Sequence, residues 1–193
     1  MTNAWYAEVS ADTKITQGDL VFDCPVLEWT GTVNKKSATQ DGLKALSEAI
    51  LADVVVMTQA CDLAQGKVDN VIVCPHHSLT QFKADWEKAM KDKNENPTAK
   101  AWKRYCDDIC DGYVWHLSML NCKEDGELRL ERRVVDFHTV YSLPVGFLQS
   151  FVQSKNNKRL TLLPPYREHL SQAFARFFMR VGLPINIAKN WEK

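Results

Sequence analysis

Asp53-Val54-Val55-Val56-Met57-Thr58-Gln59 is the clearest strand signal in the chain, because polar residues bracket four consecutive apolar ones. Three β-branched valines in a row favour a buried strand over a helix. Val71–Cys74 repeats this pattern after a polar segment, and Leu20–Cys24 precedes it, directly after the turn signal Gln17-Gly18-Asp19. The three runs predict neighbouring strands of one sheet.

Helical spacing appears in the parts of the chain that lack this strand pattern. Residues 79–112 predict an inserted helical hairpin with Gly112 as its C-terminal cap, and residues 165–181 predict a C-terminal helix. The apolar positions of these helices recur three or four residues apart: Phe82, Trp86, Ala89 and Met90, then Trp102, Tyr105 and Ile109, then Leu170, Phe174, Phe177, Phe178 and Val181. A short helix is also expected where Leu43, Leu46, Ala49 and Ile50 recur at the same spacing.

These elements predict an α+β fold in which a small, curved antiparallel sheet or barrel carries the hairpin and the C-terminal helix. A chain of 193 residues fits one domain, so we expect residues 1–193 to fold as a single unit.

The charge balance excludes the strongly basic class of nucleic-acid-binding proteins. Lys+Arg and Asp+Glu both number 24, so the chain has no overall basic excess. Apolar runs such as Val54–Met57 are far too short to cross a bilayer, and Met1–Trp5 has no leader-like pattern. We therefore expect a soluble, cytoplasmic protein without a membrane partner.

The six cysteines show no disulfide-scaffold spacing, and in a cytosolic protein we expect most of them to be packed free thiols. The alternative is a zinc site. Cys106 and Cys110 share a helix face, and Cys61, Cys122 or His116 would complete the ligand set. The chain has no C-x-x-C pair, so we predict no metal and no cofactor.

The first candidate site follows the valine-rich strand, where Thr58, Gln59, Cys61 and Asp62 lie at its end. Side chains at a strand end can project into a cleft while the strand holds them in place. Cys61 is a candidate nucleophile, although the neighbouring carboxylate disfavours a thiolate. The structural alternative is that Thr58 and Asp62 hydrogen-bond the turn and Cys61 packs inside.

A second candidate lies in Cys74-Pro75-His76-His77-Ser78, again directly after a predicted strand. His77 is a candidate acid or base because histidine changes charge near neutral pH. The alternative is a solvated loop with one histidine capping the next helix. A set of arginines and lysines also indicates either a phosphate-binding groove or a salt-bridged surface: Arg129, Arg132, Arg133, Lys158, Arg159, Arg167, Arg176 and Arg180.

Several of these segments together resemble the MazF/PemK-like toxin family, whose fold is a small SH3-like barrel. Gly18-Asp19 matches the family's opening of the first strand, and Val54–Thr58 its β-branched second strand ending in a hydroxyl. Val71–Ser78 falls at its third strand, which ends in Pro-x-Thr-Ser, and Val134–Leu148 resembles its later strand and short helix. The resemblance covers about half of the chain and implies an SH3-like barrel.

The chain departs from this family at the residues that the family's ribonucleases use. They place an arginine just before the second strand, where this chain has Ala52 or Asp53, and a threonine where this chain has His77. The phosphate stabiliser is therefore missing from its expected position. The resemblance supports a fold more than an activity.

Two functions from different classes follow. In the first, a diverged site binds nucleic acid or a nucleotide, with phosphodiester hydrolysis as its reaction. His77 is the acid or base, Asp62 orients it or a metal, and the other site residues are Cys61, Asp19, Thr58 and Gln59. In the second, the chain is a non-catalytic interaction module that uses the aromatic C-terminal helix to bind a protein partner or a second copy.

Overall fold

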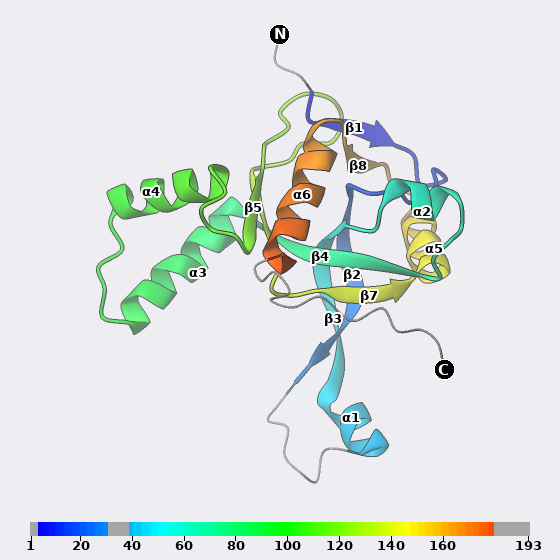
Figure 1. Ribbon diagram of the computed structural model, residues 1–193, viewed down its shortest axis with the longest axis horizontal. Coiled ribbons are helices and arrows are strands. Elements are labelled where there is room, and N and C mark those ends of the chain that lie inside the picture. Colours follow the sequence, from blue (N-terminus) through cyan, green and yellow to red (C-terminus); the bar gives the residue numbers. More distant parts are fainter. Residues whose placement is uncertain (1–3, 31–38, 180–193) are drawn as a thin grey trace, which may run out of the picture.

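The computed structural model describes residues 4–30 and 39–179 of the chain and shows an α+β fold (Figure 1). Within these residues an open, antiparallel eight-stranded sheet combines with six helices. The strands are β1 (Tyr6–Val9), β2 (Asp19–Trp29), β3 (Ser47–Val56), β4 (Asn70–Ser78), β5 (Leu117–Leu120), β6 (Arg133–Asp136), β7 (Tyr141–Pro144) and β8 (Arg159–Leu162). The helices are α1 (Gln40–Leu46), α2 (Ala60–Ala64), α3 (Leu79–Asp92), α4 (Ala99–Cys110), α5 (Val145–Lys155) and α6 (Tyr166–Phe178).

The sheet follows the order β1-β8-β2-β3-β4-β6-β5, and β7 pairs with β4 off this path. Strand β4 is the branch point. Its first half pairs with β7, its last three residues pair with β6, and its middle pairs with β3 on the other side. One continuous strand therefore carries the chain from the middle of the sheet to the start of the helical hairpin.

The valine-rich strand forms the centre of the core, because consecutive valines of a strand point to opposite faces. Val55 pairs with Leu20 and with Cys74, and these side chains pack with Leu170 of α6 on one face. Val54 faces the other way and packs in a second cluster with Leu148 of α5. Both faces of the central strands are covered, which explains their unbroken apolar run.

The predicted helical hairpin is confirmed as α3 and α4, which lie to one side of the sheet in Figure 1. Ser78 and Thr98 cap the two helices by accepting a hydrogen bond from a backbone N–H in the first turn. Ile109 anchors the hairpin by packing against Leu117 and Val134 of the sheet. The predicted C-terminal helix is confirmed as α6, and its expected last residues, 180 and 181, lie outside the described part.

The expected helix around residues 43–50 is only partly correct. Helix α1 ends at Leu46, and the chain continues as strand from Ser47 because Ala49 and Ile50 pair with Leu27 and Val26 of β2. Tertiary pairing overrides the helical spacing of these few residues.

The outer ends of β2 and β3 extend away from the rest of the sheet toward α1, and we call residues 25–30 and 46–51 the arm (Figure 1). Leu27, Trp29 and Leu51 lie on one face of the arm, because Leu27 pairs with Ala49, two residues from Leu51. About two-thirds of each of these three side chains is exposed, at 66%, 66% and 68%. The arm thus presents the broadest apolar face among the described strands.

No helix in residues 4–30 or 39–179 has the length and apolar character needed to cross a membrane.

Candidate functional site

A bulge in β2 builds the candidate site. Val21 pairs with Val54 and Cys24 with Ala52, so that Phe22 and Asp23 together oppose the single residue Asp53. Asp23 adopts a left-handed backbone conformation with φ of 49°, which lets the strand absorb the extra residue. The Asp23 backbone N–H then donates to Oδ1 of Asp53 over 3.0 Å. Bulges of this kind re-aim side chains, and this one fixes the Asp53 carboxylate.

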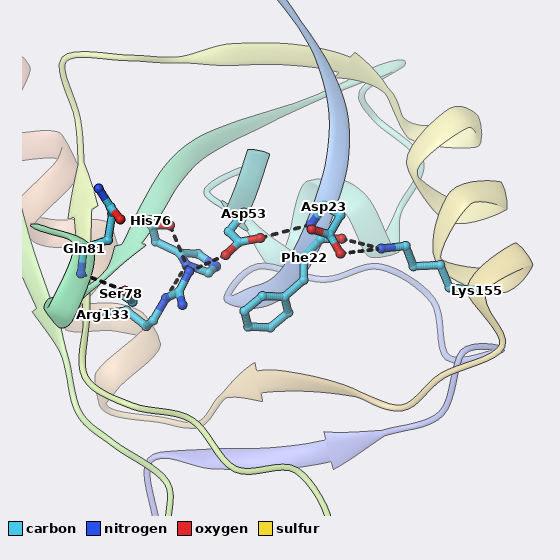
Figure 2. A network of polar contacts seen from close by, with 8 residues as sticks. All are labelled: Phe22, Asp23, Asp53, His76, Ser78, Gln81, Arg133 and Lys155. Carbon is cyan, nitrogen blue, oxygen red and sulfur yellow. Dashed lines mark hydrogen bonds and ion pairs between the residues drawn. The ribbon is translucent and has the colours of Figure 1, made fainter. Parts of the chain in front are cut away.

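Lys155 of α5 holds the bulge from the other side. Its ammonium donates to the Phe22 carbonyl at 2.9 Å and lies 3.2 Å from the Asp23 carboxylate (Figure 2). The bulge is therefore tied to a helix as well as to the sheet.

Arg133, the first residue of β6, completes the network from the opposite side of Asp53. Its Nη2 forms an ion pair with Oδ2 of Asp53 and also donates to the His76 carbonyl at 3.2 Å (Figure 2). Its Nε donates to Nδ1 of His76 at 3.0 Å, and the guanidinium lies 5.3 Å from the centre of the Phe22 ring. Nη1 donates to no described residue. The guanidinium is thus held by three groups and keeps one nitrogen free for a ligand.

His76 is a neutral, buried member of this network, with only 1% of its surface exposed. Burial holds the pKa of His76 well below its ordinary value of 6.5, and the positive charge of Arg133 lowers it further. Because Nδ1 accepts from Arg133, the imidazole proton lies on Nε2. Nε2 has no hydrogen-bond partner among the described residues. His76 is therefore a positioning group for the guanidinium.

A cleft of about 430 Å³ opens over this network, between the base of the arm and the start of α3. His77, the residue after His76, also lines the cleft and is exposed. Its side chain leaves β4 on the face opposite to those of His76 and Arg133. The other polar lining residues of the cleft are Glu28, Asp53, His76, Ser78, Gln81, Arg133, Thr139 and Tyr141. A carboxylate, an imidazole and a held guanidinium in one cleft are the groups that acid–base chemistry on an anionic ester requires.

The predicted cluster after the valine-rich strand lies elsewhere. Thr58 accepts a hydrogen bond from the backbone N–H of Ile72 at 2.7 Å, and His77 lies five residues farther along the same strand. At roughly 3.3 Å per residue, His77 therefore lies about 16 Å along β4 from Ile72, the residue that Thr58 contacts. Gln59, Cys61 and Asp62 continue beyond Thr58 into α2, so the structure does not bring them together with His77.

Asp19 is also separate from the cleft, because its side chain is completely buried. Its carboxylate accepts from Nε of Arg159 at 2.9 Å, and Arg159 also donates to the carbonyls of Ser10, Thr13 and Lys14. Burial raises the pKa of Asp19, and the nearby Arg159 opposes this shift. The pair ties the segment before β2 to β8, which is a structural role in this arrangement.

The six cysteines differ in how deeply they are buried. Cys24 and Cys74 are buried, Cys106 and Cys122 are half-buried, and Cys61 and Cys110 are exposed, all as free thiols. Fewer of them are packed inside than the sequence led us to expect, because none of the three cysteines in helices, Cys61, Cys106 and Cys110, is fully buried. No group of three or more potential metal ligands occurs in the described part of the chain.

Sequence reasoning identified His77 but missed Glu28, Asp53 and Arg133 as its neighbours. The available signal was a charge beside a buried run: Asp53 directly precedes three valines, and Arg133 directly precedes Val134-Val135. A charged side chain beside a buried run is partly removed from water and needs a partner. Its partner here is the other charge, 80 residues away.

No family model matches this sequence, and no curated protein or solved structure matches it either.

Proposed function

We propose that the cleft binds a phosphodiester of nucleic acid or a nucleotide and supports its cleavage by proton transfer. The observation that carries the proposal is the guanidinium of Arg133, which Asp53 and His76 hold at the floor of a cleft that also contains His77. A fixed guanidinium with a free Nη1 is suited to a non-bridging phosphate oxygen. The resembled toxin family carries an arginine at the position of Ala52 or Asp53, and in this chain the guanidinium of Arg133 contacts Asp53.

His77 and Glu28 are the titratable pair for the chemistry. In the reaction a nucleophilic oxygen, from water or a neighbouring hydroxyl, forms a bond to phosphorus while the bond from phosphorus to the leaving oxygen breaks. One group removes the proton of the nucleophile and the other protonates the leaving oxygen. Arg133 stabilises the charge that develops on the phosphate. Serine, threonine and tyrosine hydroxyls of the lining are available to orient the substrate.

The charged groups of the cleft affect the affinity for a substrate differently from the rate of the reaction. Two carboxylates, Glu28 and Asp53, stand against the single guanidinium of Arg133, so the cleft carries a small net negative charge and does not itself attract an anion from solution. The proposal therefore expects modest affinity for a small phosphodiester and a clear loss of rate when a proton-transfer group is removed.

The fold belongs to the same hypothesis. We propose that the curved sheet is a diverged SH3-like barrel of the MazF/PemK-like family, elaborated by α3, α4 and α6. In support of this proposal, two of the segments that carry the resemblance are neighbours in the sheet, because Val54–Val56 of β3 pair with Val73–Pro75 of β4.

Cleavage of fluorophore-quencher RNA and DNA oligonucleotides tests the proposed function, with and without Mg²⁺. We expect His77→Ala and Glu28→Gln to lower the rate by about 10²–10⁴-fold, which is the usual contribution of a general acid or base. His169→Ala removes an exposed histidine of α6 outside the cleft and should keep the wild-type rate. A wild-type protein that neither binds nor cleaves these substrates would falsify the proposal.

A second candidate function is protein association through the arm. Phe174 and Phe177 of α6 pack against the core around Phe137, while Phe178 is 61% exposed. The exposed apolar surface is therefore greater on the arm than on the helix. Sedimentation over a hundredfold range of concentration tests association, and Trp29→Ser should abolish it. A monomer at every concentration would contradict the proposed self-association.

A further inference from the structure

We propose that a second surface, the groove between the helical hairpin and the segment that precedes β6, binds the backbone of a single-stranded polynucleotide that continues from the cleft. This inference rests on the proposed function of the cleft and names its substrate as a strand rather than a mononucleotide. The groove has a volume of about 820 Å³, and Lys83, Trp102, Arg129 and Arg132 line it.

Two cations of the groove, Arg129 and Arg132, are available to a ligand, whereas Lys83 is paired with Glu87 and Lys123 with Glu8 and Asp125. Arg129 and Arg132 form no ion pair with any residue in the described ranges. Glu131, the nearest carboxylate in sequence, instead accepts a hydrogen bond from Thr80 at 2.8 Å. Four cationic side chains and two carboxylates line the groove, and the two arginines without an ion pair make it more positive than the cleft. A positive groove supplies the attraction for phosphates that the cleft lacks.

The geometry joins the groove to the cleft. Arg132 and Arg133 are consecutive, and consecutive residues of an extended chain point to opposite sides. Arg133 reaches the cleft and Arg132 the groove, with the first turn of α3 between them. The chain is tightly held here, because the Leu79 backbone N–H donates to the Arg132 carbonyl at 2.8 Å. Two phosphate-binding arginines on either side of one helix start suit a polymer that spans both surfaces.

Trp102 gives the groove an aromatic wall. The ring is packed within the hairpin against Trp86 and Tyr105, with ring centres 5.2 and 6.3 Å away, and it also lines the groove. Aromatic side chains beside a cationic track stack with the unpaired bases of single strands, and a duplex offers no such base faces. The combination favours a single strand over a duplex or an acidic peptide.

The test measures binding of a fluorescent twelve-nucleotide uridine RNA in a His77→Ala background, which prevents turnover. We expect Arg129→Ala/Arg132→Ala to lower affinity at least tenfold. Removing two phosphate contacts should also reduce the slope of log affinity against log salt by about 1.4 for a single strand. The matched control is Lys100→Ala/Lys103→Ala, which removes two exposed cations of α4 outside the groove and should change affinity less than twofold.

Four results of the binding experiments would overturn the inference. These are unchanged affinity and salt slope in the arginine double variant, an equal loss in the lysine control, equal affinity for a duplex, and full competition by polyglutamate. Cleavage of a dinucleotide separates the two proposals, because it depends on the cleft alone. A wild-type protein that cleaves the dinucleotide but fails to bind the longer strand overturns the groove and leaves the cleft. The thermal midpoints of all variants establish that they are folded.

Discussion

Arg133 donates from its Nε to Nδ1 of His76 across 3.0 Å, and the two residues are 57 positions apart in the chain. This bond turns a histidine into a fixed acceptor and sets the direction of the guanidinium. It also requires that the imidazole stay neutral, because a protonated Nδ1 cannot accept.

This relationship predicts a pH dependence of stability. The pKa of His76 is lowered in the folded protein, so at pH values below 6.5 the unfolded chain binds a proton that the native state does not. Stability should therefore fall as the pH decreases through 6.5, with a slope of about 1.4 kcal/mol per pH unit for this group. His76→Gln keeps an acceptor for Arg133 without the titration. Urea unfolding at pH 5, 6, 7 and 8 should show a steeper decline for the wild type, and parallel curves would contradict the assignment.

The buried pair of Asp19 and Arg159 predicts non-additive mutations. Arg159→Met leaves the completely buried carboxylate of Asp19 unpaired and should cost about 3–5 kcal/mol. Asp19→Asn on top of Arg159→Met removes that charge and should restore at least about 1 kcal/mol. Urea unfolding of the two single variants and the double variant gives the coupling. Simple addition of the two losses would show that the pair is not coupled.

Gly18 predicts a steric effect that a matched glycine does not share. Gly18 has φ of 85°, and a Cβ there would lie 2.9 Å from Cβ of Leu162. Gly66 also has a positive φ, 62°, but a Cβ there meets nothing within 4 Å. Gly66→Ala should cost about 1 kcal/mol for the left-handed backbone, and Gly18→Ala about 1–3 kcal/mol more for the clash. Equal losses of unfolding free energy would exclude the contact with Leu162 as a constraint.

The thiols should differ sharply in reactivity. Burial raises the pKa of Cys24 to about 11 and of Cys74 to about 12, whereas Cys61 is exposed. At pH 8 iodoacetamide should modify Cys61 in the native protein and leave Cys24 and Cys74 unmodified. Peptide mass spectrometry measures the three sites together. Equal labelling of all three without denaturant would mean that the core opens readily.

Cys61→Ser tests whether the active groups lie in the cleft, because Cys61 lies in α2, beyond the end of β4 that is far from His77. The substitution should leave oligonucleotide cleavage unchanged. A loss comparable to that of His77→Ala would move the active groups to α2 and away from the cleft.

Several elements were predictable because their signal is local. The β-branched run at Val54–Val56, the apolar run at Val71–Cys74 and the three long helices each carry their pattern within a few residues. The short strands β1, β7 and β8 carry no such pattern. Each is four residues long and mixes polar with apolar side chains, so its pairing partner and not its composition makes it a strand.

Local sequence patterns were enough to predict an α+β chain with a valine-rich central strand, an inserted helical hairpin and an acid–base candidate in His77. The polar network beside His77 depends on tertiary contacts: a bulge in β2 aims Asp53, and β6 brings Arg133 to it from 80 residues away. The physical reason is one of range. Propensity and periodicity act between residues a few positions apart, whereas a polar network forms only when strand pairing brings distant charges within hydrogen-bond distance.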